Sequence, residues 1–370
     1  MVPSQFLPHP TRILRLTATF VALTAFACVP GLRAQSHPRV ITAEESQGGL
    51  YVTSGRMLVN FGKREFIGTA TMIRRYTALT AGHILFDPDM GFASQLRYEP
   101  AYYYGSAAVQ RSATFAVLSG YQSASQSDPN GDRAFAQDMG YLLLSTPAYG
   151  DRWADWTASP GTLTTTDADL IAFGYAADKL DGEAIAFVQP SLPYFQLSVP
   201  TLYENKSFYT EGGMSGGPVY GTVDGKPRVL GVNVAGTDYT DPALSDARVI
   251  SSSEVSLFTD AEYAQGLVAG GFIKAPPSVA AGGTVKLKTG AIFADGKREK
   301  TDLPVRYDEL TLVVVGNQSK KVTLTRIKPG KYVATFSSKL KAGATLTFAL
   351  QRSTLPPTQT PVQTVTVQVR

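Results

Sequence analysis

The chain has 370 residues, more than a typical single domain, and its 44% hydrophobic and 17% charged residues are ordinary for a soluble globular protein of about two folded units. Its formal net charge is +4, and this sum alone does not indicate a class of binding partner. The only cysteine is Cys28, which excludes a disulfide framework.

Residues 1–34 are typical of a secretory signal peptide. Arg12 and Arg15 precede the apolar stretch from Leu16 to Val29, and small residues lead to Ala34. We expect cleavage after Ala34 and export to the periplasm or the medium, which would leave a mature protein without cysteine. The apolar run is shorter than the ~20 residues that span a bilayer, so a membrane anchor is the weaker alternative. Lipid attachment at Cys28 is a minor alternative.

Residues 45–260 alternate short apolar runs with Gly, Pro, Asn and Asp, which predicts many β-strands. The clearest predicted strands are Thr114 to Leu118, Gly140 to Leu144, Leu170 to Tyr175 and Val229 to Val234. A weak helical period, with Leu257, Ala261, Ala264 and Val268, predicts a closing helix over Ser253 to Gly271.

Three short segments carry the residue types that acyl transfer by serine needs. Residues 77–83 read Thr-Ala-Leu-Thr-Ala-Gly-His and end at His83, while residues 213–218 read Gly-Met-Ser-Gly-Gly-Pro around Ser215. Between them, Asp138 precedes the apolar run Gly140 to Leu144. A serine hydroxyl needs an imidazole to take its proton and a carboxylate to orient the imidazole. His83, Asp138 and Ser215 are therefore the candidate catalytic residues.

In motif and chain order these segments resemble the trypsin- and chymotrypsin-like serine peptidases. Residues 68–73 and 231–236 resemble two further strands of that family, so the resemblance spans roughly residues 45 to 260. It implies an all-β fold, a chymotrypsin-like double β-barrel, and peptide hydrolysis without cofactor or metal. The absence of cysteine in the mature chain is more similar to the secreted bacterial branch, which includes glutamyl endopeptidases. The resemblance also implies an oxyanion hole made by the N–H groups of Gly213 and Ser215.

A lipase-like reading of the same serine is excluded by the histidines. Residues 213–217 also satisfy Gly-x-Ser-x-Gly, the nucleophile elbow of α/β-hydrolases, which need a histidine after the serine. All three histidines, His9, His37 and His83, precede Ser215.

The chain departs from the trypsin pattern at positions that govern activation. Met214 stands where animal relatives carry the aspartate that captures the new N-terminus of an activated zymogen. Residues 39–42 superficially resemble an activation site, but we predict activity that does not require cutting after Arg39. Val234 replaces a serine that usually supports the catalytic aspartate.

The residues expected to contact substrate do not resolve a specificity. Tyr209 stands where trypsin has its pocket aspartate, so a preference for Arg or Lys is not supported. Thr210 matches a threonine of glutamyl endopeptidases, but Asn233 replaces their histidine, so a preference for Glu is in doubt. The candidate substrate-binding residues are Thr210, Asn233, Val234, Ala235 and Gly236.

Beyond Ala275-Pro276-Pro277 the pattern changes to clean alternation. Val285 and Leu287 are separated by lysines, and similar period-two runs recur up to Val369. We therefore divide the chain into a signal peptide (1–34), a peptidase domain (35–274) and a small β-sandwich (275–370) that resembles bacterial immunoglobulin-like modules.

The charge divides at the same boundary. Residues 35–275 hold 16 Lys and Arg against 25 Asp and Glu, and residues 276–370 hold 15 against 5, giving about −9 and +10. A basic module suggests attraction to an anionic surface such as an envelope polymer, although it can equally be a solvated face that balances an acidic partner domain. Nucleic acid is an unexpected partner for an exported protein.

Two alternatives remain at this stage. Residues 128–132, Asp-Pro-Asn-Gly-Asp, have alternate oxygen-bearing side chains that could begin a calcium loop, but a polar turn is the better interpretation. The whole chain could also be a catalytically silent scaffold that acts in binding or adhesion, since no sequence can show that three side chains meet.

Overall fold

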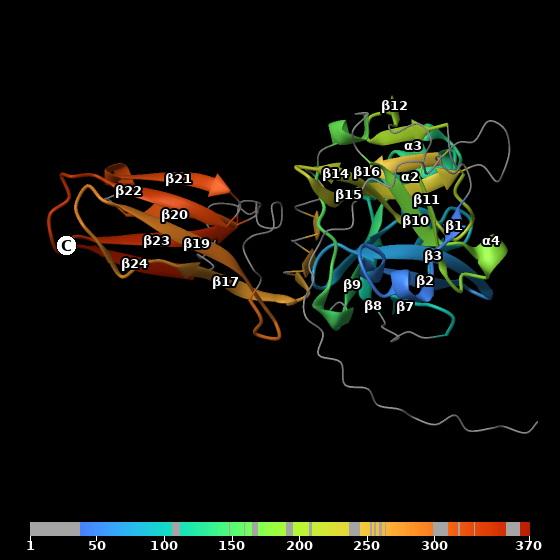
Figure 1. Ribbon diagram of the computed structural model, residues 1–370, viewed down its shortest axis with the longest axis horizontal. Coiled ribbons are helices and arrows are strands. Elements are labelled where there is room, and N and C mark those ends of the chain that lie inside the picture. The colour runs from blue at the N-terminus through green and yellow to red at the C-terminus, as the bar shows by residue number, and fades with distance from the viewer. Residues whose placement is uncertain are drawn as a thin grey trace, which may run out of the picture. The chain divides into compact units, whose positions relative to one another are not determined.

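A computed structural model gives the structure of the chain (Figure 1). It describes residues 38–105, 112–147, 149–158, 160–164, 169–189, 195–206, 209–236, 245–251, 254, 257–258, 261–262, 264–298, 310–316, 319–328, 330–352 and 363–370. The predicted signal peptide lies outside these residues, as does Cys28.

β-strands dominate the described residues, in two large curled sheets, two four-stranded sheets and one two-stranded ribbon. The first large sheet has the order β7-β2-β3-β4-β9-β8. Its strands are β7 (Gln95–Pro100), β2 (Ser54–Phe61), β3 (Arg64–Met72), β4 (Thr77–Thr80), β9 (Gly140–Leu144) and β8 (Ser112–Val117). A two-stranded ribbon, β5 (Phe86–Asp87) with β6 (Gly91–Phe92), follows β4 in the chain.

The second large sheet has the order β1-β11-β10-β14-β15-β16-β13-β12. Its strands are β1 (Arg39–Val40), β11 (Ile185–Val188), β10 (Ile171–Tyr175), β14 (Pro218–Val223), β15 (Lys226–Gly236), β16 (Ser245–Val249), β13 (Leu202–Asn205) and β12 (Gln196–Val199). All of its pairings are antiparallel.

Apolar burial holds the two large sheets together. Met57, Leu79 and Leu142 from the first sheet and Phe173 and Val232 from the second belong to one buried cluster, each no more than 1% exposed. Burial of apolar side chains is the dominant favourable term in folding, and this cluster needs no disulfide. The arrangement is consistent with the chymotrypsin-like barrel fold expected from the sequence.

Helices are short and lie between strands. Those whose bounds are described are α1 (Ala43–Ser46), α2 (Ser119–Ser127), α3 (Asp132–Phe135) and α4 (Ala177–Leu180), with 3-10 helices η1 (Tyr51–Thr53), η2 (Gly82–Ile84), η3 (Tyr149–Asp151), η4 (Pro160–Thr164) and η5 (Ser319–Lys321).

The helix predicted over Ser253 to Gly271 is wrong in its last part. Glu254, Phe258 and Glu262 are among the described residues that are helical, but strand β17 begins at Val268. Pairing with a distant strand, β19, overrides the local helical period there.

The C-terminal residues form two four-stranded sheets. One has the order β17-β19-β22-β21 and the other β18-β24-β23-β20. Their strands are β17 (Val268–Lys274), β19 (Thr284–Phe293), β22 (Lys331–Phe336), β21 (Val322–Lys328), β18 (Ser278–Val279), β24 (Gln363–Val369), β23 (Thr345–Arg352) and β20 (Leu310–Val315). Leu287 and Phe336 of the first share a buried cluster with Phe348 and Val367 of the second. The predicted boundary at Ala275 falls after β17, whose partner β19 lies beyond it.

Candidate active site

His83 follows β4 and lies in the short 3-10 helix η2. β4 ends at Thr80, whose hydroxyl donates to the carbonyl of Thr69 on β3 at 2.7 Å, and the chain then turns into η2, which contains His83. β4 also pairs with β9, and Thr80 lies opposite Gly140. The residues just after β4 and just before β9 are therefore neighbours in space.

Asp138 lies in that neighbouring position and is fully buried. One carboxylate oxygen, Oδ1, accepts a hydrogen bond from the backbone N–H of His83 at 2.8 Å, and Oδ2 lies 2.6 Å from the ring nitrogen Nδ1. A buried carboxylate needs such partners to offset the loss of solvent. The proton is thereby placed on Nδ1, and Nε2 is left as the basic nitrogen.

The pKa of the His83 imidazole is set by two opposing effects. Burial lowers this pKa, while the charge of Asp138 and its hydrogen bond raise it by more, so the pKa lies above its ordinary value of 6.5. The side chain of His83 is 30% exposed, so a substrate can reach the ring.

Ser215 lies in a loop just before β14 that is held by hydrogen bonds to two other segments and by one within the loop. Its carbonyl accepts from the N–H of Thr69 at 2.9 Å, and the N–H of Gly216 donates to the carbonyl of Asn233 at 2.8 Å. The N–H of Gly217 donates to the carbonyl of Met214 at 2.9 Å. The loop therefore joins both large sheets.

Gly213 has a backbone conformation that favours glycine, with φ 85°. A Cβ there would lie 2.3 Å from the carbonyl oxygen of Tyr175, so no larger residue fits. Its carbonyl accepts from the hydroxyl of Thr69 at 2.8 Å. Within the described residues, the N–H groups of Gly213 and Ser215 donate no hydrogen bond, so both are available to an oxyanion.

Thr69 is a residue that the sequence analysis missed as part of this site. It contacts the loop through both its N–H and its hydroxyl, and the hydroxyl also accepts from the N–H of Tyr175 at 2.9 Å. No short motif marks this role, because its partners are more than 100 residues away in the chain.

His83 and Ser215 line one cavity, of about 280 Å³, together with Gly213. Among the described residues the Ser215 hydroxyl forms no hydrogen bond to the imidazole. Such bonds are often long before substrate binds. The structure thus places all three candidate catalytic residues in one region, with the His83–Asp138 contact formed.

Four candidate substrate-binding residues, Asn233 to Gly236, lie on β15 of the second sheet, and the fifth, Thr210, lies in the connection before β14. Thr210, Asn233 and Val234 are buried, Ala235 is half-buried and Gly236 is exposed. None of the five lines the cavity that contains Ser215. The Thr210 hydroxyl lies 3.2 Å from that of Ser245, and a Cβ on Gly236 would lie 2.1 Å from Thr210 Oγ1. Ser245, opposite Gly236 across β15 and β16, was not identified from the sequence.

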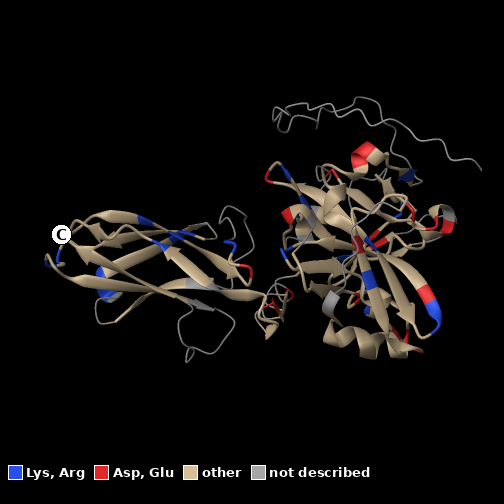
Figure 2. Ribbon diagram, turned by 90° about the horizontal axis from the view of Figure 1, so that it is seen from below, with Lys and Arg blue, Asp and Glu red and all other residues tan. Residues whose placement is uncertain are grey.

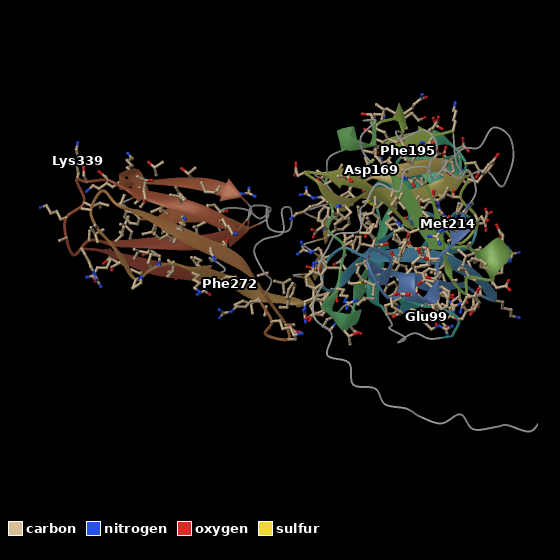
Figure 3. The ribbon with its side chains drawn as sticks, in the orientation of Figure 1. Glu99, Asp169, Phe195, Met214, Phe272 and Lys339 are labelled. Carbon is tan, nitrogen blue, oxygen red and sulfur yellow. The ribbon has the colours of Figure 1, made fainter. Side chains whose placement is uncertain are left out.

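Met214 and Arg39 take structural roles in this chain. Met214, labelled in Figure 3, is buried in a cluster with Ala172 and Val219 of the second sheet, and its sulfur accepts from the N–H of Glu211 at 3.4 Å. Arg39 pairs with Glu45 at 2.9 Å, and β1 is paired with β11. In this structure Met214 is therefore packed inside the protein, and Arg39 lies in an ion pair at a paired strand.

Asp128 forms a local turn, since its Oδ1 accepts from the N–H of Asn130 at 3.3 Å. Across the residues described, no group of three or more His, Cys, Asp or Glu side chains could hold a metal ion.

Among the residues that the structure describes, there is no helix with the length and apolar character to cross a membrane.

No family model and no curated protein matches the chain. Among solved structures it is similar to the thermostable serine protease AL20 from an extremophilic microorganism, with 18% identity over 57% of this chain and 97% of that one, at a TM-score of 0.47. It is also similar to a Glu endopeptidase, with 16% identity over 62% and 98%, at 0.48. The secreted serine protease VesC from Vibrio cholerae matches with 14% identity over 90% and 70%, at 0.45. Similarities at this level of identity do not establish an activity for this chain.

Proposed function

We propose that the chain is a secreted serine endopeptidase that hydrolyses peptide bonds through His83, Asp138 and Ser215. The observation that carries the proposal is the double contact between His83 and the fully buried Asp138, beside a cavity that Ser215 also lines. A buried carboxylate that fixes the tautomer of a solvent-accessible imidazole is the arrangement that general-base catalysis requires.

In the proposed reaction, Nε2 of His83 takes the proton of Ser215 as the serine oxygen attacks the peptide carbonyl. The N–H groups of Gly213 and Ser215 would stabilise the resulting oxyanion. The C–N bond then breaks, and His83 gives its proton to the leaving amine. Water, activated by the same imidazole, hydrolyses the acyl-enzyme and restores the serine hydroxyl.

Intact-mass analysis after exposure to a fluorophosphonate probe tests this proposal. The serine oxygen would displace fluoride, adding one phosphonyl group, and Ser215→Ala and His83→Ala should both abolish the adduct. Ser123→Ala, at an exposed serine of α2, is a matched control that should keep it. A folded protein without adduct would refute the proposal.

The competing function is a silent scaffold, and the missing hydrogen bond between Ser215 and His83 is the observation that favours it. The same experiment decides between them, because only an activated serine reacts with the probe.

We propose further that the C-terminal sheets form an accessory β-sandwich that meets an anionic surface. Figure 2 shows lysines and arginines on its strands, and Lys286 and Lys288 are exposed on either side of the buried Leu287. Retention of the full chain on dextran sulfate should weaken in a Lys286→Gln, Lys288→Gln variant and with added salt. Unchanged retention would assign these lysines to a solvated face.

A further inference from the structure

The cavity beside Ser215 has an apolar wall that the proposed catalytic residues do not require. Phe61, Phe66 and Ile67 of the β2–β3 hairpin, Ile84 of η2 and Phe86 of β5 line it. His83, Ser215 and Gly213 also line this cavity. An apolar cavity with a few polar groups at one end is the usual form of a ligand site.

The apolar wall contains a buried ring, that of Phe86, and a solvent-exposed ring, that of Phe66. Phe86 is only 2% exposed and packs edge-to-face against Tyr121, with ring centroids 6.3 Å apart. Phe66 is 41% exposed, although it contacts Phe61 with centroids 5.7 Å apart and an interplanar angle of 79°. A further apolar group that entered the cavity would therefore cover ring surface that now faces water.

The position of the cavity indicates which half of a substrate would enter it. Its lining comes from the first large sheet and its connections, together with the loop at Ser215, and includes none of residues 233–236 of β15. In the proposed reaction the leaving nitrogen must lie beside His83, because the imidazole protonates it. The departing half of the substrate therefore lies on the side of Ser215 where this cavity opens.

One carboxylate, that of Asp87, is among the groups that line the cavity. Its Oδ1 accepts from the N–H groups of Asp89 at 2.9 Å and Met90 at 2.8 Å. These bonds hold the carboxylate in place beside the apolar wall. An acidic side chain in the cavity would meet both an apolar surface and a like charge.

We propose that this cavity binds a large apolar side chain, aromatic or aliphatic, on the leaving-group side of the scissile bond, and that it disfavours Asp and Glu there. The proposal rests on the proposed serine peptidase function and adds a substrate preference to it. A volume of about 280 Å³ accommodates one side chain of that size.

Capture of the acyl-enzyme by added amines tests the preference without knowledge of the natural substrate. p-Nitrophenyl acetate would acylate Ser215 and release p-nitrophenol, and an amino-acid amide can then compete with water. In this step the amine nitrogen forms the new C–N bond, the ester bond to Ser215 breaks, and His83 transfers the proton to the serine oxygen. The amide thus occupies the leaving-group site, and the ratio of acetyl-amide to acetate measures its binding there.

Phenylalaninamide and leucinamide should be captured about tenfold better than glycinamide, and aspartic acid α-amide should be captured less well than glycinamide. Phe66→Ala should reduce the preference for phenylalaninamide, and Phe66→Leu should retain that for leucinamide. Asp87→Asn keeps the Oδ1 acceptor and should raise capture of the aspartic acid amide. Leu197→Ala removes a side chain that is 57% exposed outside the cavity and should change nothing.

The outcomes separate this inference from the function on which it rests. If no acyl-enzyme forms and the fluorophosphonate adduct is absent, both are overturned. If Ser215 is acylated and hydrolysed but all amides are captured equally, or if Phe66→Ala leaves the ratios unchanged, the leaving-group preference alone is overturned.

Discussion

Asp138 contacts His83 twice, at the backbone N–H at 2.8 Å and at Nδ1 at 2.6 Å, so one carboxylate fixes both the position of the residue and the orientation of its ring. The contact depends on the pairing of β4 with β9, since each residue lies just beyond the end of one of these strands. The candidate catalytic pair is thereby attached to two paired strands of the first sheet.

Asp138→Asn should lower kcat by roughly 10⁴-fold, because an amide that still accepts from the backbone would donate to Nδ1 and leave the proton on Nε2. Turnover of a small ester measures the effect. Asp128→Asn, at an exposed aspartate of the same connection, is the control and should retain activity. Equal losses in both variants would contradict the role of Asp138.

The pH dependence of kcat/KM should follow the ionisation of His83. Because the pKa of this imidazole is raised above 6.5, the basic form is lost as the pH falls through a midpoint above 6.5, and activity falls with it. The same shift means that His83 favours the folded state below pH 6.5 and that this contribution is lost as the pH rises through the folded pKa. A kcat/KM that does not change between about pH 5 and about pH 9 would exclude His83 as the base, and a midpoint below 6.5 would contradict the raised pKa.

Gly216→Ala should destabilise the protein far more than Gly225→Ala. Both residues have positive φ, 79° and 69°, so both variants carry a backbone penalty of about 1 kcal/mol. A Cβ at Gly216 would also lie 2.1 Å from Thr80 Oγ1, whereas nothing lies within 4 Å at Gly225. Urea unfolding measures the difference. Similar midpoints for the two variants would show that the loop at Ser215 can shift to accommodate the added Cβ at little cost in stability.

Arg39→Gln should leave the fluorophosphonate adduct intact. The loop at Ser215 is held by Thr69 and Asn233, and Met214 at this position carries no charge that could capture a new N-terminus. The pair of Arg39 with Glu45 is more than a third exposed on each side, so its loss should cost less than about 1 kcal/mol. Reaction only after cleavage at Arg39 would contradict this expectation.

Asp246→Asn should stabilise the protein at neutral pH and above. Burial, with repulsion from Glu204 and Asp132, raises the pKa of Asp246 to about 7, and within the described residues its Oδ1 has no hydrogen-bond partner. The folded state then binds more protons than the unfolded state between pH 3.8 and about 7, so stability falls as the pH rises through this window.

The expected gain for Asp246→Asn is about 2 to 4 kcal/mol near pH 8, since each pKa unit corresponds to about 1.4 kcal/mol, and it should vanish below about pH 4. Urea unfolding of both proteins as a function of pH measures it. A gain that is independent of pH would point to packing instead of charge.

Local patterns were sufficient for many of the strands. Gly140 to Leu144 was predicted as a strand and is β9 with the same bounds, because the hydrophobic run Tyr141 to Leu144 favours a buried strand. The helical period ending at Gly271 failed because Val268 pairs with Phe293, a partner that no local window contains.

The site shows the same division. The sequence by itself determined the residue types of His83, Asp138 and Ser215, the glycines that their loops require and the apolar runs that carry them, since these depend on local chemistry. Only the tertiary structure decided that Asp138 contacts His83, that Thr69 holds the loop of Ser215, and that Phe61, Phe66 and Phe86 form one wall beside it. These contacts follow from strand register and from the packing of sheets, which join residues far apart in the chain and leave no mark in any short segment.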